Sequence, residues 1–244
     1  MALGIVGRRG QPVGPLPAAA RSGPSGPRVE APESVGHLDP ASWRLGLPTL
    51  SGAHLWLREL DVSDTPHLLN LLNEGDVSKF LTPPPRTPSG FRRFVRWTHR
   101  RRAEGRYACF AVVPRATDAA AGFFQLRAVE AGVATAEWGF VIGRPYWGTG
   151  LFAEGADLLL SFAFEQMALS RIEARAVAAN GRANGALRKL GAVQEGVLRQ
   201  AVSIDGRHYD TTLWSILEAD WRGARRAPAN GRTLGSARIQ ARIQ

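Results

Sequence analysis

The sequence predicts an α/β (α+β) domain, in which helices flank a mixed, mostly antiparallel twisted sheet. Three predicted strands follow one another between residues 107 and 142, which is typical of an antiparallel meander. The dipeptide Asp205-Gly206 between two further strands is a strong signal for a two-residue hairpin. A glycine turn at 148–150 separates a strand from an apolar helical run. This mixture excludes a pure sandwich or a pure helical bundle.

Length and charge indicate one domain with tails. The chain has 244 residues, of which 44% are apolar. We expect a disordered arm rich in Pro, Gly and Ala over 1–48, the domain over 49–223 and a basic disordered tail over 224–244. The net charge of +10 lies mostly in the two tails. The domain therefore requires no polyanionic partner, although the Arg-rich tail could contact nucleic acid nonspecifically or improve solubility.

Cysteine and apolar patterning predict a cytoplasmic protein. Cys109 is the single cysteine, so neither an internal disulfide nor a cysteine-based zinc cluster can form, and we expect no metal. Cys109 lies in an apolar run, where a buried thiol is expected in preference to a nucleophile. No run approaches the roughly 18 apolar residues that cross a bilayer, so no membrane partner is expected. The oligomeric state, monomer or homodimer, stays open.

The first elements combine a short strand with a capped helix. Leu55–Leu60 has the composition of a strand, and Asp61 to Asp64 supply residues that cap a helix from about Thr65 to Asn73. The segment 81–88 must be a loop, because its three consecutive prolines cannot donate to a helix or a sheet.

A basic amphipathic helix follows this loop. We expect Ser89 to cap it and Glu104 to mark its end. Apolar residues form one stripe of this helix, and six arginines occupy the remaining surface. We expect a solvated basic face over an aromatic stripe that packs on the core; the alternatives are a nucleic-acid surface or an entrance for an anionic ligand.

The remaining elements alternate strands with helices. The predicted strands are Tyr107–Pro114, Gly122–Glu130, Val133–Ile142, Arg171–Val177, Gly196–Ile204 and His208–Leu217. The predicted helices are the apolar run Leu151–Phe164 and the segment Asn180–Leu190, which Gly191 closes.

The glycine turn at the end of the fourth predicted strand is the first candidate site. Gly148 and Gly150 bracket Thr149 where the helical run begins, and a backbone without side chains can approach a ligand closely. The first amides of a helix have no partners within the helix, and the helix dipole adds positive charge there. Such a turn can hold a phosphate or pyrophosphate, although two glycines also make an ordinary connection between a strand and a helix.

Several separated segments together resemble the GNAT N-acetyltransferases, most closely the branch of ribosomal-protein N-terminal acetyltransferases. Arg144-Pro-Tyr-Trp-Gly-Thr-Gly150 with Glu154 resembles the pyrophosphate loop of that family. The segment Asn180-Gly-Arg-Ala-Asn-Gly-Ala-Leu-Arg-Lys-Leu-Gly191 resembles its second helix on the coenzyme side. The segments 192–199 and 205–216 are similar to its closing strands, so the resemblance covers about residues 50–222. The order and spacing of these segments match jointly, which makes the resemblance specific.

The resemblance implies acetyl-CoA as cosubstrate, in a cleft where the fourth and fifth strands diverge, with an amine acceptor entering from the other side. It also implies the GNAT acyltransferase fold. The residues that it places at the coenzyme are Phe140, Val141, Ile142, Arg144, Gly148, Thr149, Gly150, Leu151, Asn180 and Lys189. The sequence departs from the family pattern at two positions, and each departure removes an expected side-chain contact with the coenzyme. Pro145 stands where the family often has Gln or Arg, and Ala183 stands where it usually has Ser.

Acetyl transfer to an amine needs a base, a stabilised oxyanion and a proton for the departing thiolate. Backbone amides of the diverging strand can stabilise the oxyanion. Glu137 is the best candidate for the base, because burial in an apolar strand would raise its pKa. The alternatives are a Glu137 carboxylate that an Arg binds, or a base that acts through water. Tyr146 and Tyr209 are candidate acids, ranked below Glu137 because either can be a packing or wall residue.

Three functions fit these residues. The first is acetylation of a protein N-terminal α-amino group, whose pKa of about 8 requires only modest help from a base. The second is acetylation of a small amine such as an aminoglycoside or a polyamine, which a narrow acidic pocket would favour. The third is a catalytically inactive module that binds coenzyme A or nucleic acid.

Overall fold

The predicted mixed α/β fold is confirmed by a computed structural model, which describes residues 42–81, 86–129 and 134–226. In these ranges the strands form one sheet with the order β1-β2-β3-β4-β5-β6-β8-β7. Neighbouring strands are antiparallel except for the pair β5 and β6. The strands are β1 (Leu50–Ser51), β2 (Leu55–Glu59), β3 (Tyr107–Pro114), β4 (Gly122–Ala128), β5 (Thr135–Ile142), β6 (Arg171–Val177), β7 (Val193–Ile204) and β8 (Arg207–Leu217).

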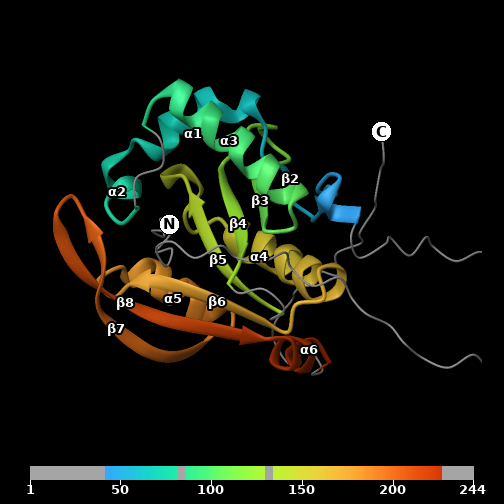
Figure 1. Cartoon of the computed structure of the whole chain (residues 1–244), viewed down its shortest axis with the longest axis vertical. Coiled ribbons are helices and arrows are strands. Elements are labelled where there is room, and N and C mark those ends of the chain that lie inside the picture. Colours follow the sequence, from blue (N-terminus) through green and yellow to red (C-terminus); the bar gives the residue numbers. More distant parts are fainter. Residues whose placement is uncertain (1–41, 82–85, 130–133, 227–244) are drawn as a thin grey trace, which may run out of the picture.

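Helices cover both faces of the sheet (Figure 1). One face carries α4 (Leu151–Ser161) and α5 (Gly181–Lys189). The other carries α1 (Thr65–Leu72), α2 (Gly75–Ser78) and α3 (Pro88–Ala103). None of the helices in the described ranges combines the length and the apolarity that crossing a membrane requires.

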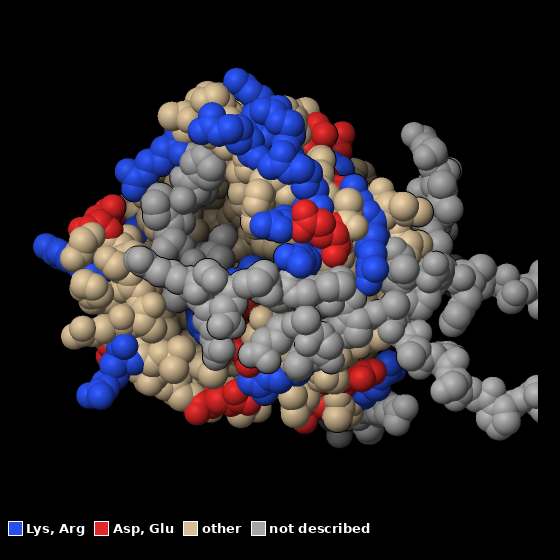
Figure 2. Space-filling model, viewed as in Figure 1, with Lys and Arg blue, Asp and Glu red and all other residues tan. Residues whose placement is uncertain are grey.

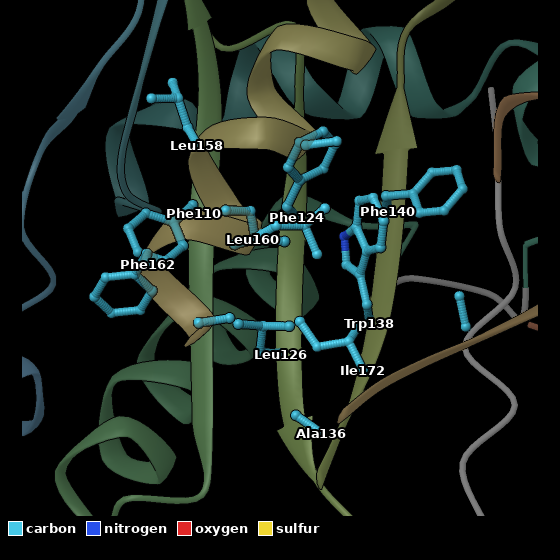
Figure 3. Close-up of a cluster of buried hydrophobic side chains, with 14 of the residues drawn as sticks. Phe110, Phe124, Leu126, Ala136, Trp138, Phe140, Leu158, Leu160, Phe162 and Ile172 are labelled. Atoms are coloured by element: carbon cyan, nitrogen blue, oxygen red, sulfur yellow. The ribbon is translucent and has the colours of Figure 1, made fainter. Parts of the chain in front are cut away.

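The larger core lies between the sheet and α4. The inward residues of β5 alternate, so that Trp138 and Phe140 join Phe124 of β4 in one aromatic cluster (Figure 3). Phe110 and Phe162 meet edge to face, with ring centroids 5.1 Å apart. All five aromatic side chains are at most 1% exposed. The core therefore fixes β5 rigidly, and with it the position of the turn that follows.

Two segments at the ends of the domain are packed against this core. Ser42–Arg44, within the predicted arm, form a 3-10 turn that buries Trp43. The helix α6 (Glu218–Arg226) was not predicted; it begins at the end of β8, runs into the predicted tail and buries Trp221 against the core. Both were missed because single tryptophans in Arg-rich and Pro-rich surroundings give no periodicity. The remainder of the arm and of the tail lies outside the described residues.

The basic helix α3 has the predicted solvated face. Phe91 and Val95 are buried in the second core, and Phe94 and Trp97 pack against it. Arg92, Arg93, Arg96 and Arg100 are exposed, and Figure 2 shows Lys and Arg side chains gathered where α3 lies. The predicted cap was wrong: the Thr87 hydroxyl accepts the N–H of Gly90 at 3.2 Å, and Ser89 lies within the first turn. Thr87 has the extended backbone of an N-cap, whereas Ser89 follows Pro88 at the first helical position.

The other bounds differ from prediction by a few residues. β7 begins at Val193 and not at Gly196, and α4 ends at Ser161 before a π-helical turn to Gln166. The predicted strand ends at Glu130 and Val133 fall outside the described residues. The very short α2 was missed because four residues cannot show a helical period.

Candidate active site

β5 and β6 run side by side and then separate. Their register pairs Thr135–Trp138 with Arg171–Ala174 and goes no further. β4 stays paired with β5 as far as Ile142, so the second edge of β5 beyond Trp138, at Gly139–Val141, has no strand partner among the residues that the structure describes. These are the fourth and fifth strands of the sequence prediction, and the gap between them is where the resemblance places the reaction. Backbone groups along an unpaired edge can hydrogen bond an extended ligand.

The side chains of this edge point into the two cores. Phe140 packs on the α4 side and Val141 on the α3 side, and each is 1% exposed. Any contact of these two residues with a ligand in the gap must therefore come from their backbone. The Ile142 carbonyl accepts a hydrogen bond from the indole N–H of Trp147 at 2.7 Å.

The glycine turn has the backbone that a close approach requires. Gly148 and Gly150 have φ angles of +78° and +89°, which L side chains rarely adopt. A Cβ atom at either glycine would meet no protein atom within 4 Å, so the space in front of them is open. Gly150 is the N-cap of α4, and in the part of the chain that the structure describes no side chain caps this helix. The first amides of α4 are thus available to an anion.

A cavity of about 410 Å³ opens at this turn, between α4 and α5. Five of the predicted site residues line this α4–α5 cavity: Ile142, Tyr146, Gly148, Gly150 and Lys189. Thr149 and Leu151 do not line it. The Thr149 hydroxyl donates to the Tyr146 carbonyl at 2.8 Å and closes the turn, while the Leu151 side chain is buried in the core.

Sequence reasoning missed Trp147 and Arg182 as site residues. The Arg182 guanidinium lies 4.1 Å from the centroid of the Trp147 ring, so the first turn of α5 and the glycine turn are joined by a cation–π contact. Trp147 packs partly against both cores. The signal for Trp147 was its place inside the predicted loop, but Arg182 had none, because the contact joins segments 35 residues apart.

A second cavity of about 270 Å³ adjoins the first on the α2 side. Asp76, Lys79 and Phe80 form one wall of this α2 cavity. Trp147, Gly181 and Arg182 line both cavities and therefore form the wall between them. Two adjoining cavities with a common wall suit two substrates that have to meet.

Arg144 and Asn180 lie differently from the expectation. The Arg144 guanidinium pairs with the Asp76 carboxylate at 3.1 Å, and Arg144 lines neither cavity. The Asn180 side chain caps α5 by accepting the N–H of Ala183 at 3.1 Å. Asn180 is 5% exposed and lines the α2 cavity, not the α4–α5 cavity.

Glu137 is an ion-paired carboxylate on the α3 side of the sheet. It is 7% exposed, and its Oε2 atom lies 2.5 Å from a guanidinium nitrogen of Arg127 on β4. Of the roles that the sequence left open, the structure shows the carboxylate bound by an Arg. Glu137 comes one residue before Trp138, the last residue of β5 that pairs with β6. Nearby, Tyr107 donates a hydrogen bond to Gln125, and burial raises the pKa of its phenol well above the usual value.

Tyr209 and Cys109 are not beside Tyr146. Tyr209 packs in a small cluster with Val202 and Ile204 of the β7–β8 hairpin, and Phe80 joins the same cluster. The two tyrosines proposed as acids therefore lie in different places: Tyr146 lines the α4–α5 cavity, and Tyr209 belongs to the cluster at the β7–β8 hairpin. Cys109 is buried as predicted, and burial raises the pKa of its thiol, which keeps it protonated.

The described residues contain no group of His, Cys, Asp and Glu that could hold a metal ion.

Residues 54–193 match the family model described as the acetyltransferase (GNAT) domain. An uncharacterized N-acetyltransferase p20 from Bacillus licheniformis is 27% identical over 178 residues, which cover 72% of this chain and all of the relative. A ribosomal N-acetyltransferase by name, YdaF from Bacillus subtilis (strain 168), is 28% identical over 88 residues, which cover 36% of this chain and 48% of YdaF.

Solved structures agree with these matches. The structure of a probable GNAT-family acetyltransferase from Chromobacterium violaceum ATCC 12472 has a TM-score of 0.63 at 26% identity. The match covers 84% of this chain and all of that one.

Proposed function

Because the chain belongs to the GNAT acetyltransferase family, we propose that it transfers the acetyl group of acetyl-CoA to the α-amino group of a protein N-terminus. The family assignment rests on the domain match over more than half of the chain. The acceptor and the residues of the mechanism are our proposal, and the following observations support it.

The α4–α5 cavity fits the anionic end of acetyl-CoA. The described residues that line it include Arg182 and Lys189 and no Asp or Glu. The uncapped N-terminus of α4 adds the partial positive charge of the helix dipole, and the left-handed glycines leave open space in front of the amides. In this arrangement the pyrophosphate lies at Gly148–Gly150, and the pantetheine arm follows the unpaired edge of β5 toward the gap.

The reaction then takes place between the two cavities. The acceptor nitrogen forms a bond to the thioester carbon, the bond from that carbon to sulfur breaks, and the proton lost by the nitrogen balances the proton gained by the thiolate. Backbone N–H groups of β5 that face away from β4 stabilise the carbonyl oxygen as it gains negative charge. Glu137 accepts the amine proton directly or through water, with Arg127 orienting its carboxylate. Tyr146, which lines the α4–α5 cavity, is the nearer donor for the thiolate on the coenzyme side.

The charge of the cleft carries the proposal about the acceptor. Among the described residues that line the two cavities, Asp76 is the one acid, and it is already paired with Arg144. Three cations, Lys79, Arg182 and Lys189, line the same cavities. The α2 cavity, which is left for the acceptor, is lined by Lys79 and Arg182, and these charges repel polyamines and aminoglycosides, whereas the single amine of a peptide N-terminus can enter as the neutral base. The name of the relative YdaF supports a protein acceptor.

An acceptor screen tests the proposal. Thiol release from acetyl-CoA is measured with peptides that have free N-termini, with the same peptides after N-terminal blocking, and with polyamines and aminoglycosides. We expect release with the free peptides and none with the blocked ones. A higher kcat/KM with a polyamine or an aminoglycoside than with every peptide would overturn the proposed acceptor, and release with blocked peptides that contain lysine would move the reaction to side-chain amines.

A further inference from the structure

Lysine is very scarce in this chain, yet both lysines lie in the cleft. Of 31 basic residues only Lys79 and Lys189 are lysine. Lys189 lines the α4–α5 cavity, and Lys79 lines the α2 cavity. An ammonium group differs from a guanidinium in being a compact point charge with three rotatable donors. Lys79 does not line the α4–α5 cavity, which the proposed function gives to the coenzyme, so it can serve a different ligand.

Lys79 is a cation without an acidic partner among the residues that the structure describes. No carboxylate in these ranges lies within ion-pairing distance of its Nζ atom. Asp76, one turn earlier in α2, is held by Arg144 instead. The Lys79 Nζ atom lies 5.3 Å from the centroid of the Phe80 ring, which lines the same cavity. The charge is thus available to a ligand.

The neighbouring backbone holds Lys79 in place. Its N–H donates to the Gly75 carbonyl at 3.1 Å as the C-cap of α2. Phe80 packs with Val177, Val202 and Ile204, which ties this end of α2 to the β7–β8 hairpin across the cavity. The ammonium is therefore presented from a fixed wall, although the side chain itself is exposed.

We infer that the acceptor carries a carboxylate close to the amine that is acetylated, and that Lys79 binds this carboxylate. The inference rests on the proposed function, since it assigns the α2 cavity to the acceptor. A cavity of about 270 Å³ holds only the first residues of a peptide, so the carboxylate belongs to Asp or Glu at the second or third position. The same chemistry exists in a free amino acid, whose own carboxylate lies beside its amine.

The test compares acceptors that differ only in charge. Peptides of one sequence with Asp, Gln or Lys at the second position, and free amino acids, are assayed by thiol release with saturating acetyl-CoA. We expect kcat/KM to be about three- to tenfold higher for the Asp peptide than for the Gln peptide, and lowest for the Lys peptide. The Asp preference should weaken as salt is added, because the contact is exposed.

Variants then assign the preference to Lys79. Lys79→Gln should reduce the ratio between the Asp and Gln peptides to less than twofold, and Lys79→Arg should keep most of it. The matched control is Arg93→Gln, which removes the same charge from the exposed face of α3 outside both cavities and should leave the ratio unchanged. The KM for acetyl-CoA should be unaffected by Lys79→Gln.

The outcomes separate this inference from the proposed function. Release with all three peptides at equal rates, or an Asp preference that persists in Lys79→Gln, would overturn the role of Lys79 and leave peptide acetylation standing. A raised KM for acetyl-CoA in Lys79→Gln would place the ammonium at the coenzyme and overturn it too. Release with free amino acids but with no peptide would support an acceptor that carries a carboxylate and would overturn the proposal that the acceptor is a peptide. Release only with polyamines or aminoglycosides, which lack a carboxylate, would overturn both the role of Lys79 and the proposed peptide acceptor.

Discussion

The substitution Gly150→Ala tests the coenzyme site most directly. The residue has φ +89°, and a Cβ atom there meets no protein atom within 4 Å. The new methyl group therefore causes no clash inside the protein, and it costs stability only through the left-handed backbone, roughly 1–2 kcal/mol. For a domain of this size that corresponds to a fall in Tm of about 2–4 °C for each kcal/mol. The methyl group also occupies the open space in front of the α4 amides, where the proposal places the pyrophosphate.

Gly206→Ala is the matched control for this substitution. Gly206 has φ +78° and open space at its Cβ position, but it lies in the turn between β7 and β8. Both variants should lose similar stability in thermal unfolding. In calorimetry with coenzyme A, Gly150→Ala should lose at least tenfold in affinity, about 1.4 kcal/mol, and Gly206→Ala should lose none. Equal affinity of the two variants for coenzyme A, alongside equal losses in Tm, would refute the assignment of the phosphate site.

Three further predictions concern single contacts. Glu137→Gln should lower turnover mainly at neutral pH and leave coenzyme affinity intact; equal turnover of variant and wild type across a pH series would remove Glu137 from the mechanism. Thr87→Ala should cost about 1 kcal/mol in urea unfolding through loss of the α3 cap, whereas Ser89→Ala should cost much less, and the reverse order would contradict the observed cap. The hydrogen bond from Arg171 lowers the pKa of Glu195 to about 2, so this pair contributes stability above about pH 4.5 that is lost as the pH falls toward 2. Unfolding of Glu195→Gln should show less dependence on pH in that window, and an unchanged acid profile would argue against the pair.

The elements with strong periodicity or strong turn chemistry were predictable from the sequence. The Asp205-Gly206 hairpin has the expected left-handed residues, and the strand, glycine turn and helix from Thr135 to Ser161 lie in the predicted order. These features depend on neighbours in the chain, which a sequence displays. Trp43 and Trp221 were missed because each is buried by a partner distant in sequence.

The site was predictable where the backbone determines it and not where side chains meet across space. Gly148 and Gly150 line the α4–α5 cavity, as a glycine turn before a helix indicates. Arg144 was placed at the coenzyme by the resemblance, and no feature of the sequence indicated that its guanidinium pairs with Asp76 of α2. The contact of Arg182 with Trp147 and the place of Lys79 in the α2 cavity follow from the packing of three separate segments, which no local pattern records.

If the two substrates bind as proposed, they share the wall of Trp147 and Arg182 and can be coupled thermodynamically through it. Because the same two side chains line both cavities, a ligand on one side that favours one arrangement of this pair sets the wall that the second ligand meets. Linkage requires that the factor by which the acceptor changes coenzyme affinity equals the factor by which the coenzyme changes acceptor affinity. The affinity for one substrate, measured with the other site empty and then filled, therefore reports the strength of the coupling through the Trp147 indole and the Arg182 guanidinium.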